Sequence, residues 1–195
     1  MKSLRSLLSV VLLSIASTAF AQSEAHKAAT VPPSEAQKAF TQLKNLAGSW
    51  QGPITVDPPQ PEMKNGGLGK VSLRVTSRGN ALVHEMMDPT KADDPTRYDH
   101  PVTMFYLDGD RLLLTHYCDA GNRPRMVART SPDGKKVEFD FLDLSGGNQF
   151  GHMYHAVFTA IDADHHIEDW TYMMPGEKPV HAHFDLKRVS TIASK

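Results

Sequence analysis

The sequence predicts a single all-β domain, an antiparallel up-and-down β-barrel of about 8–10 strands with one short N-terminal helix. Short runs of alternating apolar and polar residues are typical of half-buried strands, and Gly-, Asn- and Asp-containing turns of hairpin length separate them. No second long helical pattern follows the first. Consecutive antiparallel strands form a meander, and closing it removes the exposed edges. An open β-sandwich is the alternative that the same pattern allows.

The helix is expected over residues 36–46. Ser34 is a good N-cap after two prolines, and apolar residues such as Phe40 and Leu43 recur at helical spacing. Gly48 suits the left-handed position just past the helix end. The first strand follows directly, since alternate residues from Trp50 onward are apolar.

The segment Asp57–Gly69 is rich in proline and glycine and is long enough to act as a lid over one end of the barrel. Nine further strands are expected after it, each bounded by turn residues. They lie at residues 70–78, 81–87, 102–107, 111–118, 125–130, 136–142, 152–161, 166–174 and 180–189.

Residues 1–21 have the pattern of a secretory signal peptide. Lys2 and Arg5 precede an apolar run over residues 7–15, and an Ala-Phe-Ala site predicts cleavage before Gln22. The apolar run is too short for a membrane span. We therefore expect an exported protein, periplasmic or secreted, with a disordered segment over residues 22–33 and the barrel domain over residues 34–190.

Charge and cysteine content limit the class of partner. The formal net charge of the whole chain is −1, and loss of the two cationic residues in the signal segment leaves −3. This argues against nucleic acid as a partner, because such binding needs a basic face. Cys118 is the single cysteine, so no intrachain disulfide forms. The sequence leaves the oligomeric state open.

Histidine is abundant, with ten residues in the chain, and is the residue type that most suggests site chemistry. His181 and His183 share one face of the last strand, and such a pair can hold a metal ion if a neighbouring strand supplies a third ligand, such as His166 or Glu168. The alternative is a solvated strand face, because charged residues continue the same alternation. The sequence leaves enzymatic activity open and favours a protein without it, since no Gly-x-Ser-x-Gly elbow occurs and no pair of carboxylates stands out as an acid–base couple.

The opening Gly48-Ser49-Trp50 after a short helix resembles that of the calycins, the lipocalins and their relatives. This resemblance implies that Trp50 packs across the closed base of the barrel, with Arg188 from the last strand against its ring. A guanidinium over an indole contributes about 0.5–2 kcal/mol. We expect ligand contacts from Trp50 and Arg188 at the base, and from Arg74, His116 and Tyr154 as polar groups within the cup.

The C-terminal part, from Trp170-Thr171-Tyr172-Met173 to Arg188, resembles the end of the nitrobindins. Their ten-stranded calycin-like barrels bind b-type haem through a late-strand histidine, and His181 stands at that position. The opening Gly48, Trp50 and Gly52 also match, whereas Ile54 replaces a glycine. If Arg188 points inward, strand alternation turns His181 outward unless a bulge shifts the register.

Over the whole mature chain, the sequence resembles an exported bacterial family of unknown function with the opening Leu-x-x-Leu-x-Gly-x-Trp, here Leu43, Leu46, Gly48 and Trp50. The leading functional hypothesis is a barrel that binds a small apolar or amphipathic molecule in its cup. Two alternatives remain: a haem protein that uses His181, and an interaction module whose barrel is filled and holds no ligand.

Overall fold

The computed structural model describes residues 32–60, 67–91, 94–131 and 134–189. The predicted signal segment and most of the predicted disordered segment precede residue 32 and lie outside the described residues. Within the described part of the chain, no helix is both long and apolar enough to cross a bilayer.

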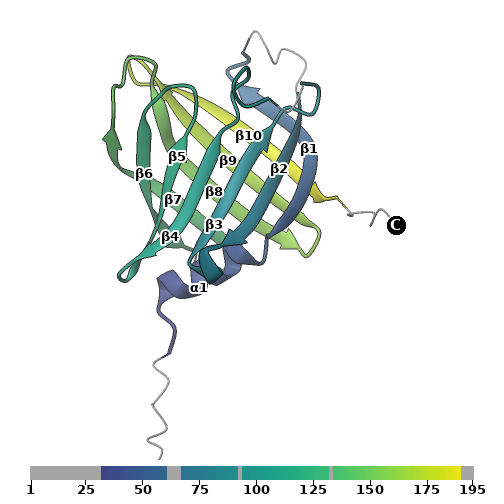
Figure 1. Ribbon diagram of the computed structural model, residues 1–195, viewed down its shortest axis with the longest axis vertical. Helices are drawn as coiled ribbons and strands as arrows, with labels where there is room; N and C mark the ends of the chain where they lie inside the picture. Colours follow the sequence, from purple (N-terminus) through teal and green to yellow (C-terminus); the bar gives the residue numbers. More distant parts are fainter. Residues whose placement is uncertain (1–31, 61–66, 92–93, 132–133, 190–195) are drawn as a thin grey trace, which may run out of the picture. The chain divides into compact units, whose positions relative to one another are not determined.

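Within these described residues the chain forms one α-helix, one short 3-10 helix and ten strands, whose arrangement Figure 1 shows. The elements are α1 (Glu35–Lys44), β1 (Gly48–Asp57), β2 (Gly67–Thr76), η2 (Ser77–Gly79), β3 (Ala81–Met87), β4 (Val102–Asp108), β5 (Arg111–Tyr117), β6 (Arg123–Thr130), β7 (Lys136–Ser145), β8 (His152–Asp162), β9 (His165–Met174) and β10 (Lys178–Arg188).

The strands form a closed antiparallel barrel in which every strand pairs with its neighbour in the sequence, and β1 pairs with β10 to close it. The predicted up-and-down barrel is therefore confirmed, and the open sandwich is not formed. The helix α1 lies at one end, the base (Figure 1), and its Ala39, Phe40 and Leu43 are buried in the barrel core. The strands β1, β3, β5, β7 and β9 run from the base to the opposite end of the barrel, the mouth.

Most predicted boundaries differ from the structure by one to three residues, and the differences at the helix and at β2 bear on the base and the mouth. The helix ends at Lys44 instead of residue 46, because a tight turn at Asn45 takes the chain toward β1. Its N-cap is as predicted, since Ser34 forms a capping box with Gln37, and the helix begins at Glu35, one residue before the expected range. Gly48 has a positive φ of 145°, but as the first residue of β1. The strand β2 begins at Gly67, so the predicted lid is shorter, and its residues 61–66 lie outside the described part.

The base of the barrel is built around Trp50, which is fully buried. Its indole Nε1 donates to the carbonyl of Leu46 at 2.8 Å, and the Arg188 guanidinium lies 4.1 Å from the ring centre. Trp50 and Arg188 are paired in register across β1 and β10, as the calycin resemblance implies. A Cβ at Gly52 would lie 1.8 Å from the carbonyl oxygen of Asp185, so only glycine lets these two strands approach here.

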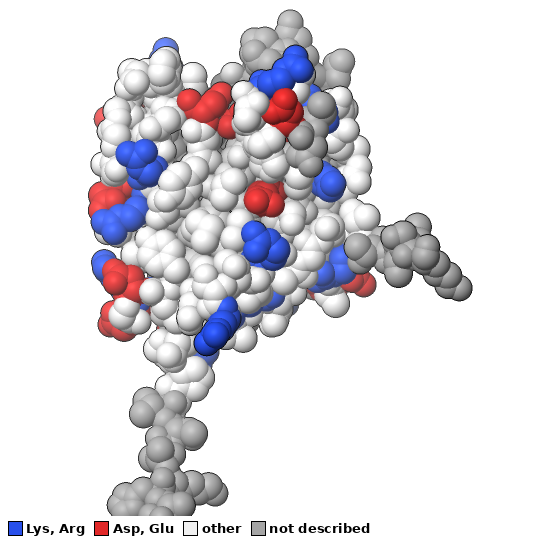
Figure 2. All heavy atoms as spheres, in the orientation of Figure 1, with Lys and Arg blue, Asp and Glu red and all other residues white. Residues whose placement is uncertain are grey.

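Large side chains fill the middle of the barrel. Phe105, Phe139, Phe158 and Trp170 are each at most 2% exposed and belong to the same continuous core cluster as Trp50 at the base. A hollow through this part of the barrel is therefore not formed, and space for a ligand must be sought at the mouth. On the face shown in Figure 2, acidic and basic side chains are interspersed.

Candidate functional site

A buried polar cluster lies inside the filled core, and Glu168 on β9 is its centre. Both carboxylate oxygens of Glu168 are within hydrogen-bond distance of His84 Nε2 on β3, at 3.1 and 2.9 Å. His166 Nε2 lies 2.9 Å from one oxygen, and Trp170 Nε1 donates to the other at 3.0 Å. All four side chains are at most 2% exposed. The cluster thus joins β9 to β3, four strands away around the barrel.

The ionisation state of Glu168 determines which neighbouring nitrogen atoms donate hydrogen bonds to it. Burial by itself raises the pKa of this carboxyl, but the interactions with His84 and His166 outweigh it and hold the pKa well below the usual range. An ionised carboxylate only accepts hydrogen bonds, so both imidazole Nε2 atoms must carry a hydrogen. The Nδ1 atoms of His84 and His166 are buried and have no hydrogen-bond partner among the described residues.

A third buried histidine, His116 on β5, stands beside this cluster. Its Nδ1 shares a 2.8 Å hydrogen bond with Thr103 Oγ1, and its ring centre lies 5.8 Å from that of Trp170. Burial and the nearby His84 lower the pKa of His116 to about 3. His116 is therefore neutral near pH 7, as a polar member of the core. It points inward, as expected, but is 1% exposed and therefore closed off from solvent.

Acid is expected to destabilise the fold through His116. In the unfolded chain this histidine takes up a proton below pH 6.5, whereas in the fold it does so only near pH 3. Stability should therefore fall as the pH drops from 6.5 toward 3, at up to about 1.4 kcal/mol per pH unit. Replacing it in His116→Asn keeps an acceptor for Thr103 and removes this titration, so the slope should become shallower.

Urea unfolding of wild type and His116→Asn between pH 7 and 4.5 measures this difference. The wild type should lose about 2–3 kcal/mol more than the variant over that range. Glu168 does not confuse the result, because the stability it contributes is lost only as the pH falls below the value of about 4.5 for an unfolded glutamate. Equal slopes in the two proteins would contradict the assignment.

The mouth holds a pocket of about 710 Å³, which we call the mouth pocket. Apolar side chains from the barrel strands form much of its wall, among them Ile54, Met86 and Phe184. The loop between β3 and β4 adds polar groups, including Asp88, and Lys91 Nζ lies 3.7 Å from that carboxylate. The remaining lining residues are Gly67, Leu68, Met87, Thr90, Asp99 and Pro101.

The predicted ligand contacts are distributed over the molecule and not gathered at this pocket. Trp50 and Arg188 lie at the base, far along β1 and β10 from the mouth. Arg74 is exposed on the outer surface of β2 and does not line the cup. Tyr154 is 41% exposed and lines a different pocket at the mouth end of β7–β10. Ligand binding by these residues stays a prediction.

His181 and His183 both lie exposed on the outer face of β10. Pairing between β10 and its two neighbours is continuous, without a bulge, so strand alternation turns both side chains away from the interior. His181 Nδ1 is 3.1 Å from Thr171 Oγ1, and His183 Nδ1 is 2.6 Å from Asp169 Oδ1. The inward-pointing His166 and Glu168 therefore cannot supply the third metal ligand suggested from the sequence.

The surroundings of His181 do not fit a buried haem. A haem needs apolar walls on both faces of its ring. The cross-strand partners of His181 are Asp57 and Thr171, which are polar, and its side chain faces solvent. A haem bound through His181 would lie on the outside of the barrel.

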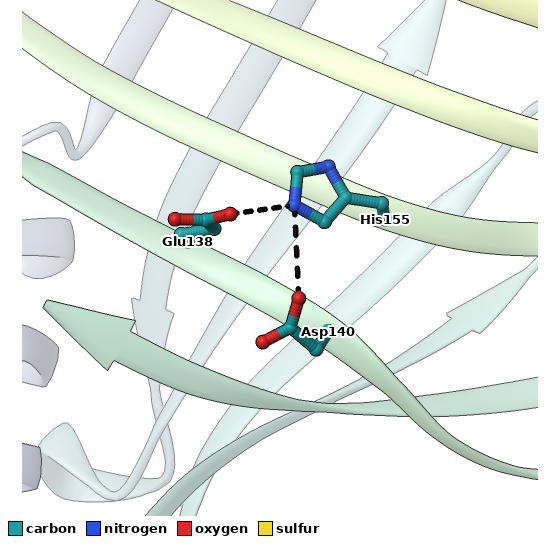
Figure 3. A group of neighbouring side chains, drawn as sticks. All are labelled: Glu138, Asp140 and His155. Carbon is teal, nitrogen blue, oxygen red and sulfur yellow. Dashed lines mark hydrogen bonds and ion pairs between the residues drawn. The ribbon is translucent and has the colours of Figure 1, made fainter.

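Another group with metal-ligand chemistry lies on the outer surface of β7 and β8 (Figure 3). Glu138, Asp140 and His155 each present one ligand atom, all within 4.8 Å of one another. His155 Nε2 is 3.0 Å from Glu138 and 3.8 Å from Asp140. However, the guanidinium of Arg129 contacts both carboxylates and holds the pKa of Asp140 below its usual range. Both carboxylates are thus already engaged by a cationic side chain, as in an ion-pair network.

The Glu168 cluster is not among the sites predicted from the sequence. A signal is present, since His166, Glu168 and Trp170 occupy alternate positions and must share one face of their strand. The tryptophan indicates that this face is buried, and therefore that a glutamate and a histidine are buried with it. No local pattern identifies the partner His84, because it precedes Glu168 by 84 residues.

Comparison with known proteins supports the fold alone. No protein-family model and no curated protein matches the chain. The crystal structure of Rv2717c from M. tuberculosis matches 78% of this chain and 98% of that one, with 15% identity and a TM-score of 0.57. A protein of unknown function of the DUF3598 family from Nostoc punctiforme PCC 73102 matches at 12% identity and a TM-score of 0.50. The match to the latter covers 76% of this chain and 49% of that protein. The chain therefore shares its barrel fold with structures of distant sequence.

Proposed function

We propose that this protein binds a small, largely apolar or amphipathic molecule at the mouth of its barrel. The observation that carries the proposal is the mouth pocket, whose volume of about 710 Å³ falls within the usual range for small-molecule sites. On the strength of the predicted signal segment, we also propose that binding takes place outside the cytoplasm.

The lining of the mouth pocket suits an amphipathic ligand. Ile54 and Phe184 are paired directly across β1 and β10, and Met86 reaches the same pocket from β3. These side chains offer a continuous apolar wall to the tail of a ligand, while methionine adapts to its shape. Asp88 and Lys91 on the loop can contact a polar head group at the solvent side.

The filled core below the pocket limits what can bind. Phe184 is 6% exposed and pairs in register with Glu168, so the pocket floor directly adjoins the buried polar cluster. A ligand therefore occupies the mouth and does not extend along the barrel axis. The floor is rigid, because the side chains beneath it are close-packed and hydrogen-bonded.

A neutral apolar dye, N-phenyl-1-naphthylamine, tests the proposal by its fluorescence increase on binding. Leu68 lines the mouth pocket and is 45% exposed, so Leu68→Glu places a carboxylate in the apolar wall at little cost to folding. We expect the dissociation constant to rise at least about tenfold, since the carboxylate loses hydration when the dye binds.

Val75→Glu is the matched control. Val75 lies near the other end of the same strand, is 39% exposed and is not part of the mouth pocket. This variant should bind the dye as the wild type does. Equal affinities of wild type and Leu68→Glu, or an equal loss in both variants, would show that the mouth pocket is not the binding site.

A second candidate function is an interaction module without a small ligand. The observation that favours it is the filled interior, in which Trp50, Phe105 and Phe158 leave no room along the axis. Native mass spectrometry of the protein purified from its own host separates the two functions. A bound mass supports the ligand carrier, whereas an apo mass together with no dye binding supports the interaction module.

A further inference from the structure

A second pocket, separate from the mouth pocket, lies at the mouth end of β7–β10. It has a volume of about 680 Å³, and we call it the aromatic pocket because Phe141, His152 and Tyr154 form one wall. Its lining shares no residue with that of the mouth pocket. We propose that the aromatic pocket binds a small organic cation of the quaternary ammonium class.

The three rings form one contiguous surface. Phe141 and Tyr154 are stacked with their ring centres 5.5 Å apart and an interplanar angle of 17°, and His152 lies 4.9 Å from Phe141. Pairing between β8 and β9 shifts register between Met153 and His155, so Tyr154 is the extra residue of a bulge. A bulge re-aims a side chain, and the Tyr154 ring is 41% exposed.

An exposed aromatic surface attracts cations, because the face of each ring carries negative charge density. His152 does not oppose this attraction. Burial lowers the pKa of His152 below its ordinary value, so the imidazole is neutral near pH 7. Its Nδ1 forms a 2.9 Å hydrogen bond with Asn148 Oδ1, which holds the ring in place against Phe141.

The charges of the lining favour the same class of ligand. The aromatic pocket contains one carboxylate, Glu177, and neither lysine nor arginine. Glu177 belongs to the turn between β9 and β10, and the adjacent Met173 and Met174 offer polarisable thioethers. An anion finds no cationic partner here. A weakly hydrated cation such as trimethylammonium can contact the rings and the carboxylate together, and it loses little hydration on entering an apolar wall.

Choline and its uncharged isostere 3,3-dimethyl-1-butanol form the test, since they differ in charge and share one shape. Binding to the full folded domain is followed by the NMR line width of the methyl signal of each probe. Choline should bind at least about fivefold more tightly than the isostere, and added salt should weaken its binding through Glu177. Equal binding of the two probes, or no binding of choline, would overturn the proposal.

Three variants locate the site. Replacing the exposed ring in Tyr154→Ala should abolish the preference for choline, whereas Tyr154→Phe should keep it. Removing the charge in Glu177→Gln should weaken choline binding several-fold and leave the isostere unaffected. Tyr117 is 43% exposed and lies outside the aromatic pocket, so Tyr117→Ala is the matched control and should behave as wild type. If Tyr154→Ala and Tyr117→Ala have the same effect, cation binding at this pocket is refuted.

The two sites can be tested independently. Dye binding at the mouth pocket should be unchanged in Tyr154→Ala, and choline binding should be unchanged in Leu68→Glu. Loss of both dye binding and choline binding in either variant indicates a disturbed fold, which the near-ultraviolet circular dichroism spectrum detects. Glu177→Gln then decides the proposal, because this residue is exposed and its replacement leaves the core intact.

Discussion

Replacing Trp50 by alanine is expected to lower the free energy of unfolding by about 3–5 kcal/mol. The ring is fully buried at the base, where its Nε1 donates to the Leu46 carbonyl and the His166 ring approaches edge-on with centres 4.2 Å apart. Its removal leaves a cavity and also leaves the guanidinium of Arg188 without the aromatic face that it covers. Urea unfolding at pH 7 measures the loss.

Trp50→Phe is the matched control for this prediction. The phenyl ring keeps most of the packing and the contact with Arg188, but it cannot donate to Leu46. We expect a smaller loss, of about 1–2 kcal/mol, because a buried carbonyl loses one hydrogen bond and part of the volume is empty. A loss below 1 kcal/mol for Trp50→Ala would mean that the base does not depend on this residue.

Replacing Glu168 by leucine is expected to cost about 3–5 kcal/mol at pH 7. The carboxylate accepts hydrogen bonds from His84, His166 and Trp170, and all of these donors are buried. Leucine fills a similar volume but leaves their N–H groups without a partner, and each buried unpaired donor costs about 1–3 kcal/mol. The measurement is the free energy of unfolding in urea.

Glu168→Gln separates charge from shape. The amide keeps the size and one acceptor oxygen, but its NH2 group faces an imidazole N–H that also donates. We expect an intermediate loss, and Trp50→Phe provides an independent variant of the same core for comparison. If Glu168→Leu unfolds at the wild-type urea concentration, the buried cluster contributes nothing to stability and its hydrogen bonds are replaced without cost.

The base of the barrel could be predicted from the sequence because its residues are marked by a local pattern or by their place in the last strand. Gly48 and Trp50 follow a capped helix, and Arg188 stands in the last strand, so closure of a meander brings them together. The strand boundaries agree within a few residues for the same reason, since alternation and turn residues are local features.

The Glu168 cluster could not be predicted in this way. Polar residues at alternate positions ordinarily indicate the solvent face of a strand, and only the position of Trp170 favours the opposite. The contact with His84 depends on how the barrel curves and on which residues meet across its axis. Neither is a property of a single strand. Similarly, Tyr154 was expected to point into the cup, whereas a one-residue bulge places its ring at the rim.

The pairing of β1 with β10 has a consequence for truncated forms of the chain. The first strand, Gly48–Asp57, finds its second neighbour only in the last strand, Lys178–Arg188. Without that last strand the sheet has two unpaired edges, and Trp50 lacks its cover of Arg188. A chain terminated before residue 178 therefore keeps nine strands with open edges, so it should aggregate or be degraded more readily than the full chain.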